Sequence, residues 1–139
     1  MTDGASIGWN RRRVRARRST YQRVLGADLL LHLAVGLACL AAPQLVGDLA
    51  DAAPGAAGWI MGWGATIILV AALYAPGLQD PFRSRFPNII GVIGRYLLSM
   101  VWFVAGGRLI WFGVVELALA IVLGWLYFRY CIAEIMSRP

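Results

Sequence analysis

The sequence contains no lysine and only one histidine, and charged residues make up only 14% of its 139 residues. Without a lysine the chain can form neither a retinal-type Schiff base nor a phosphate-binding loop with its lysine. One histidine and two scattered cysteines exclude a histidine-rich di-iron site and a zinc protease motif. No catalytic motif remains, so we expect a protein that is not an enzyme by itself.

Apolar residues dominate the composition instead. Hydrophobic residues make up 60% of the chain and the mean hydropathy is +0.67, whereas soluble domains carry roughly 25% charged residues. A soluble core of this length would be too small to bury so much apolar surface, so we expect lipid to cover it. Cys39 and Cys131 fall in the first and last apolar segments, so we expect no disulfide between them.

Four apolar segments are long enough to cross a bilayer, which takes about 20 helical residues. In hydrocarbon each segment must satisfy its own backbone hydrogen bonds, so helices are required. The fold class predicted is therefore all-α, an integral membrane four-transmembrane-helix bundle. We expect an Arg-rich segment over residues 1–23 and a membrane domain over 24–139, with a loop at 43–56 and a proline-rich loop at 76–88. The predicted spans are residues 24–42, 57–75, 89–105 and 109–128.

The arginines predict the orientation. Of the 13 basic residues, all arginine, eleven lie on one side of these spans, and Arg108 alone lies on the other. The remaining one, Arg95, falls inside the third span. By the positive-inside rule both termini are cytoplasmic, and we expect a bacterial cytoplasmic (inner) membrane.

Two arginine-bearing segments are candidates for contact with lipid or with a partner. The first interpretation of the N-terminal run is a disordered topology anchor that touches anionic lipid. A tether for an acidic cytoplasmic partner is a second interpretation. Nucleic acid is the least favoured partner, because the run carries no base-reading pattern. The candidate contact residues are Arg11, Arg12, Arg13, Arg15, Arg17 and Arg18 in this run, and Arg83 and Arg85 in the loop at 76–88.

Small residues predict where helices approach one another. Gly58 and Gly62 share one face of the second span, and Gly91 and Gly94 lie early in the third. Such faces allow close backbone contact in lipid, where helices gain nothing from hydrophobic burial against each other. We expect packing within the bundle, with a homodimer face as the alternative.

Ionisable residues inside the spans are the best candidates for a site, because a charge at the bilayer centre costs at least about 2.5 kcal/mol. Asp28 and His32 are four residues apart and therefore share a helix face. Arg95 enters the third span at a depth matching Asp28, and Glu116 in the fourth span is nearest in depth to His32. We therefore predict a buried polar seam of Asp28, His32, Arg95 and Glu116.

Two roles are open for this seam. An Arg–Asp pair and a His–Glu contact would let polar side chains survive in lipid and fix helix register. Alternatively the same groups line a proton path or a pocket for a quinone or another small ligand. A third variant has His32 hold a haem or a pigment, although a single histidine makes it a weak ligand candidate. We expect no other metal site.

Several features together resemble the DoxX-like small four-helix membrane proteins. They are Arg23-Val-Leu-Gly26 at the start of the first span, Pro43 at its end, and Pro87 followed by Gly94-Arg95 early in the third. The resemblance implies a bundle that accompanies membrane redox machinery. We therefore expect a non-catalytic accessory subunit of a larger respiratory or photosynthetic complex, which shapes a quinone or lipid site. The alternatives are a small homodimeric transporter and a membrane tether for an acidic cytoplasmic partner.

Overall fold

The computed structural model describes the backbone of residues 3–137 and the side chains of residues 11–137, and this part of the chain is helical with short turns. The all-α class is confirmed, and four helices are long and apolar enough to cross a membrane, one for each predicted span. The helices are α1 (Asp3–Ala41), α2 (Pro43–Ala50), α3 (Ala57–Gln79), α4 (Arg85–Ala105) and α5 (Ile110–Met136), with a 3₁₀ turn at Gly107–Leu109.

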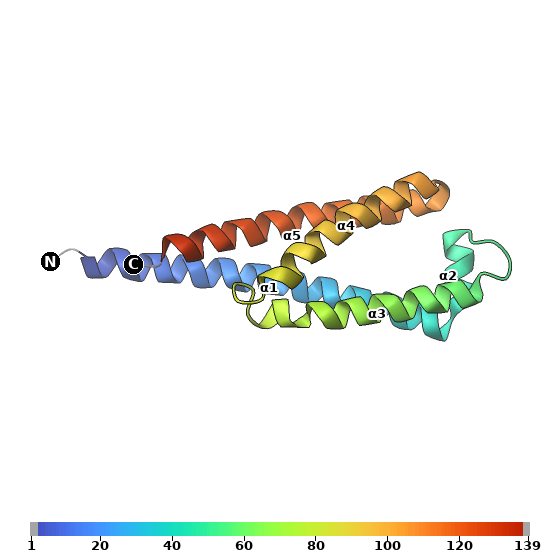
Figure 1. Ribbon diagram of the computed structural model, residues 1–139, viewed down its shortest axis with the longest axis horizontal. Coiled ribbons are helices and arrows are strands. Elements are labelled where there is room, and N and C mark those ends of the chain that lie inside the picture. Colours follow the sequence, from blue (N-terminus) through green and yellow to red (C-terminus); the bar gives the residue numbers. More distant parts are fainter. Residues whose placement is uncertain (1–2, 138–139) are drawn as a thin grey trace.

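The long helices form two pairs. Helix α1 packs along α3, α4 packs along α5, and the pairs are joined mainly where α1 meets α5. Figure 1 shows the pairs diverging away from the end at which α1 begins and α5 ends. We call this end the arginine-rich end, because Arg11–Arg18, Arg83, Arg85 and Arg129 lie there. The opposite end carries α2 and the turn between α4 and α5.

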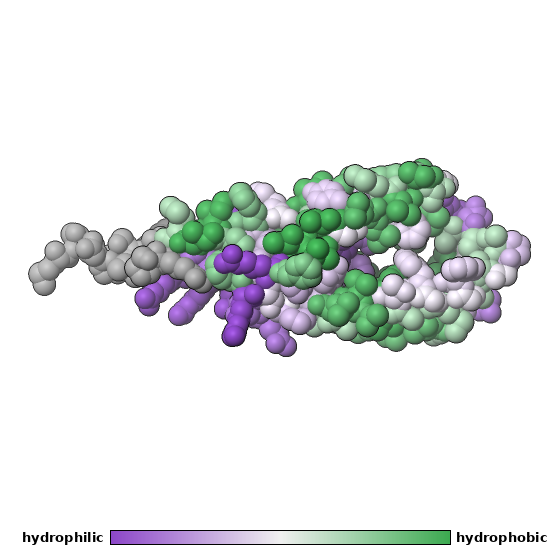
Figure 2. Space-filling model, viewed as in Figure 1, coloured by the Kyte–Doolittle hydropathy of each residue, from purple (hydrophilic) through white to green (hydrophobic). Residues whose placement is uncertain are grey.

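The long helices bury residues spaced by about one or two helical turns, as helices with a single packed face do. The stripe of α4 consists of polar and small residues, namely Asn88, Gly91, Arg95 and Ser99. The other faces expose large apolar side chains, of which Val104 is 89% exposed. Such an inside-out pattern is what lipid as the surrounding solvent requires. On the face that it presents, Figure 2 shows apolar side chains gathered along the helices between the two ends.

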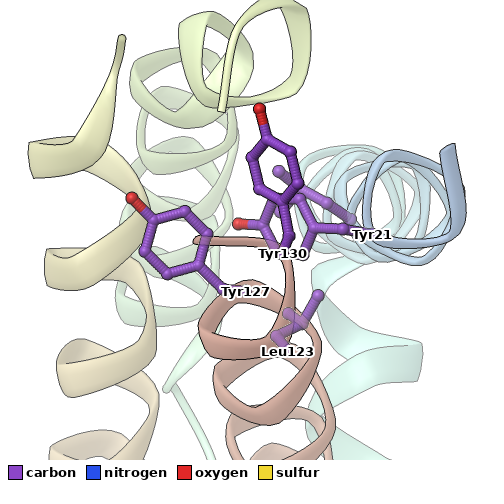
Figure 3. Close-up of a cluster of buried hydrophobic side chains, with 5 residues drawn as sticks. Tyr21, Leu123, Tyr127 and Tyr130 are labelled. Carbon is purple, nitrogen blue, oxygen red and sulfur yellow. The ribbon is translucent and has the colours of Figure 1, made fainter. Parts of the chain in front are cut away.

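A cluster of buried hydrophobic side chains lies toward the arginine-rich end. Tyr21 of α1 and Tyr127 of α5 have ring centroids 5.3 Å apart, and Tyr130 and Leu123 complete the cluster with Leu25 (Figure 3). Aromatic rings bury a large apolar area each, so this cluster holds α1 against α5.

Asn88 connects this cluster to the turn between α3 and α4. Its Oδ1 accepts a hydrogen bond from the Tyr21 hydroxyl at 2.8 Å. Its Nδ2 donates to the carbonyl oxygens of Pro81 at 3.1 Å and Ser84 at 3.0 Å. The hydroxyl of Tyr127 also donates to the Pro81 carbonyl, at 3.3 Å. One buried amide thereby satisfies carbonyls that a turn leaves without helical partners.

The expectation of a disordered arginine run is wrong for residues 11–18, which continue α1 without a break into the first span. Arginine is a good helix former, and two side chains tie the run to the bundle. Arg17 Nη1 donates to the carbonyl of Arg129 at 3.1 Å, and Arg18 Nη2 donates to that of Gln79 at 2.9 Å.

The two predicted loops are also shorter than expected. Pro43 begins α2 inside the loop at 43–56, since proline fits the first turn of a helix. Helix α3 continues past Pro76 to Gln79, and α4 begins at Arg85, so that Pro87 lies in its first turn. Helix N-termini have unpaired N–H groups in any case, so the missing N–H of Pro87 costs little there.

Candidate functional site

The four predicted seam residues meet in one cluster at the junction of the two helix pairs. Asp28 and His32 come from α1, Arg95 from α4 and Glu116 from α5. All four lie on or beside the buried stripes of their helices, and the side chains of Asp28 and Arg95 are 0% and 7% exposed. We call these residues the polar cluster.

Arg95 binds two carboxylates at once. Its Nη2 donates to Asp28 Oδ2, and its Nη1 donates to Glu116 Oε2 at 2.6 Å. The Arg–Asp contact matches the prediction from depth, whereas the Arg95–Glu116 bond was missed. Depth gives no information on rotation about the helix axis, but the forked guanidinium, which can serve two acceptors, was a signal for it.

His32 lies between the two carboxylates. Its Nδ1 is 2.8 Å from the backbone carbonyl oxygen of Asp28 and 3.5 Å from Asp28 Oδ1. Since a carbonyl oxygen only accepts, this contact places a proton on Nδ1. The other nitrogen, Nε2, is 3.4 Å from Glu116 Oε1 and 3.4 Å from Arg95 Nη1. It therefore faces an acceptor and a donor at the same distance.

The charges of the polar cluster do not cancel when His32 is neutral. Arg95 contributes one positive charge, and Asp28 and Glu116 contribute two negative ones. A proton on His32 would bring the sum to zero. Because an uncompensated charge in an apolar medium is costly, either this proton or a positively charged ligand is favoured there. Asp28 Oδ1 is buried and accepts no hydrogen bond within the described residues.

An apolar cleft opens between the helix pairs beside the polar cluster. One cavity of about 330 Å³ is bounded by Tyr74, Arg95, His32 and Glu116. A second of about 380 Å³ shares His32 and Glu116 with it and continues away from the arginine-rich end. A third of about 280 Å³ adjoins the second near α2. Figure 2 shows the opening between the two halves of the molecule.

Aromatic side chains form the walls of this cleft. The rings of Trp63 and Trp102 meet edge-on with centroids 5.7 Å apart, and Phe112 lies 6.2 Å from Trp102. Trp63 lines all three cavities, and Trp111 lines the second. Binding sites of this size usually combine apolar walls with a few polar groups. Here His32 and Glu116, which are 16% and 14% exposed, supply the polar groups.

The predicted packing glycines behave differently from one another. Gly91 and Gly94 lie beside Tyr74: a Cβ would lie 3.4 Å from its ring at Gly91 and 3.6 Å from its hydroxyl oxygen at Gly94, which is ordinary van der Waals contact. Gly58 and Gly62 face open space, so the expected packing within the bundle is wrong for them. The close helix crossing uses Gly36 and Gly64, which were not predicted. A Cβ on Gly64 would lie 2.5 Å from that of Cys39. The absence of a side chain at Gly64 therefore allows α1 and α3 to approach closely.

The arginines at the arginine-rich end surround a polar hollow of about 510 Å³, lined by Arg18, Arg83 and Arg85 with Asp80 and Glu134. The Arg85 guanidinium lies 4.0 Å from the centre of the Phe82 ring. Arg11, Arg12, Arg13 and Arg15 are exposed on the helix before it, and Arg138 lies outside the described residues. Among the contact candidates, only Arg17 and Arg18 are half-buried against the bundle.

No group of three or more His, Cys, Asp or Glu side chains within residues 11–137 is arranged to hold a metal ion. His32 does not fit a haem or pigment ligand, because Nδ1 faces a carbonyl and Nε2 faces the Arg95 guanidinium. Over the same residues both cysteines are free. The chemistry available is therefore hydrogen bonding, charge and proton exchange.

Comparisons with protein-family models, with curated proteins and with solved structures gave no match. The function is therefore inferred from the geometry of the cleft and the polar cluster.

Proposed function

We propose that the protein is a non-catalytic accessory subunit of a larger respiratory or photosynthetic membrane complex, and that its cleft binds a small apolar molecule with a polar head. The observation that carries this proposal is the polar cluster beside an aromatic-walled cleft, at a depth where lipid would otherwise surround it. The resemblance to DoxX-like proteins points to the same role.

A quinone is the ligand class that we favour. It is a flat apolar ring whose carbonyl oxygens accept hydrogen bonds, and an arginine carries five N–H donors. Arg95 lines the cavity of about 330 Å³ together with Tyr74 and Trp63. This volume falls in the usual range for ligand sites, about 300–1,000 Å³. An isoprenoid tail would extend along the apolar second cavity toward Trp111.

The proposed setting is a bacterial cytoplasmic membrane with both termini in the cytoplasm. The arginines on the arginine-rich end would then meet the anionic inner surface, and Arg108 alone would lie outside. There Arg108 Nη1 lies 3.5 Å from the Asp48 carbonyl oxygen. The exposed apolar faces would contact lipid or the larger subunits.

A small homodimeric transporter is the second candidate, and one observation favours it. Gly58, Gly62 and Thr66 form an exposed small-residue face on α3 with open space beside both glycines. Such a face suits close packing against a second copy of the chain.

Purification from the native membrane in mild detergent tests the proposal. The accessory role predicts large co-purifying subunits, whereas a homodimer alone would favour the transporter.

Titration of the purified chain with a short-tailed ubiquinone analogue should quench tryptophan fluorescence. Trp63→Leu should weaken binding about tenfold, or about 1.4 kcal/mol, because Trp63 lines the cavity that we assign to the quinone ring. Trp125→Leu is the matched control, since Trp125 lines none of the three cleft cavities.

A further inference from the structure

We propose that the cleft exchanges one proton on His32 for an apolar cation held at Glu116 Oε1. This inference rests on the proposed function only in requiring that the cleft bind a ligand. It adds a second ligand class and a coupled proton, neither of which quinone binding requires.

The first step is that one of the two ring nitrogens of His32, Nδ1, keeps its hydrogen. The Nδ1 hydrogen is held by the Asp28 carbonyl at 2.8 Å, so the ring can change its charge only at Nε2. When Nε2 carries a hydrogen it can donate to Glu116 Oε1, and when it does not it can accept from Arg95 Nη1, each at 3.4 Å. The ring therefore has a partner in either state without turning.

The second step concerns Glu116. Its Oε2 is bound by Arg95 at 2.6 Å in either state of His32. Glu116 Oε1 accepts a hydrogen bond from His32 only while Nε2 is protonated. When the imidazole is neutral, the lone pair of Nε2 faces Oε1 instead. The negative charge on Oε1 is then without a donor from His32, and a cation beside Oε1 would compensate it.

The third step is access. His32 and Glu116 line both of the larger cavities of the cleft, whereas Asp28 lines neither. The titratable or charged groups around the exchange point are Asp28 from α1, Tyr74 from α3, Arg95 from α4 and Glu116 from α5. With His32 neutral, Asp28, Arg95 and Glu116 sum to one negative charge, which one bound monovalent cation compensates.

The walls indicate the class of cation. Trp63, Trp102, Trp111 and Phe112 line the second cavity, and the remaining walls beside His32 and Glu116 are aliphatic. Aromatic rings attract a cation beyond their apolar contact. A small hydrated ion would gain nothing from them, whereas a bulky organic cation with a delocalised or shielded charge would. The exchange is balanced: the cation enters at Glu116 Oε1, the N–H bond at His32 Nε2 breaks, and its proton forms an O–H bond with water.

Titration calorimetry of the full chain in detergent with tetraphenylphosphonium, which has no proton to lose, tests the exchange. Repeating the titration in buffers of different ionisation enthalpy counts the protons released. We expect release approaching one proton per cation while His32 is protonated. Over that pH range the affinity for the cation should rise about tenfold per pH unit, because the proton and the cation compete. It should level off at higher pH, where His32 is already neutral.

Three variants make the result specific. Glu116→Gln should abolish cation binding at every pH, while Arg95 keeps its partner Asp28. His32→Leu should retain cation binding but lose both its pH dependence and the proton release. Glu134→Gln, an acidic residue near the far end of the same helix as Glu116, is the matched control and should behave as the parent. Size-exclusion profiles and helicity by circular dichroism establish that each variant is folded.

The outcomes separate this inference from the proposed function. Binding of the quinone analogue without binding of the cation overturns the exchange and leaves the proposed function standing. Cation binding without proton release also overturns the exchange. If a folded chain bound neither probe, both proposals would be wrong.

Discussion

At the scale of single residues, Arg95 decides whether the polar cluster can exist inside an apolar bundle. It compensates Asp28, which is fully buried, and also Glu116 at the edge of the cleft. A buried ion pair adds little stability over apolar residues of the same volume, but breaking one by removing a single partner is expensive. Removing one member of the polar cluster should therefore destabilise the protein more than replacing the charged members together by apolar residues.

This dependence predicts the behaviour of substitutions. Arg95→Met should destabilise the bundle by about 3–5 kcal/mol, because two buried carboxylates lose their cation. The triple variant Arg95→Met, Asp28→Leu, Glu116→Leu should recover most of that loss. Reversible unfolding in mixed micelles with a rising fraction of denaturing detergent measures both. A cost below about 1 kcal/mol for Arg95→Met would contradict the compensating role of the guanidinium.

Asn88 gives a second prediction at this scale. It makes three hydrogen bonds to Tyr21, Pro81 and Ser84. Asn88→Leu should cost about 1–3 kcal/mol, because the Tyr21 hydroxyl and buried carbonyls lose their partner. Gln22→Leu is the control, because its Nε2 donates to the carbonyl of Leu78 in a half-buried position. We expect it to cost less than Asn88→Leu in the same micelle unfolding assay.

At the scale of helices, glycines set how closely α1 and α3 approach. A Cβ on Gly64 would lie 2.8 Å from the Gly36 carbonyl oxygen, and one on Gly58 or Gly62 would meet nothing within 4 Å. We expect Gly64→Ala to cost about 1–3 kcal/mol, as overpacked sites do. Gly58→Ala and Gly62→Ala should be neutral or stabilising by up to about 1 kcal/mol, through helix propensity. Thermal unfolding of the three variants compares them. Equal effects at Gly58 and Gly64 would contradict the crossing.

The same glycines show how far a sequence specifies helix contacts. Hydropathy and length identify α1, α3, α4 and α5, because lipid allows no other backbone structure. The depths of Asp28 and Arg95 follow from residue spacing, and the two do meet. Rotation and neighbour choice do not follow: a small-xxx-small pattern occurs at Gly58 and Gly62 without a contact, whereas Gly36 and Gly64 lie on different helices and form no motif in either.

At the scale of the whole molecule, the cleft arises from the way two helix pairs diverge. The pairs are joined at the arginine-rich end by the tyrosine cluster and Asn88, and they diverge away from that end (Figure 1). No single segment encodes such a cavity, since its walls come from α1, α3, α4 and α5 together. The polar side chains that line it were predictable because charge is costly in lipid. Its aromatic walls were not, since tryptophans at a membrane end are equally typical of interface anchors.

Orientation gives the last prediction. With Cys39 and Cys131 replaced by alanine, a cysteine at Ser137 reports on the arginine-rich end, and a cysteine at Ala53, exposed between α2 and α3, reports on the other end. The positive-inside rule predicts that a membrane-impermeant maleimide labels Ala53→Cys in intact spheroplasts and labels Ser137→Cys only after permeabilisation. The reverse pattern would place the arginine-rich end outside. It would then remove the electrostatic attraction to the anionic inner surface on which the proposed contact of these arginines with lipid depends.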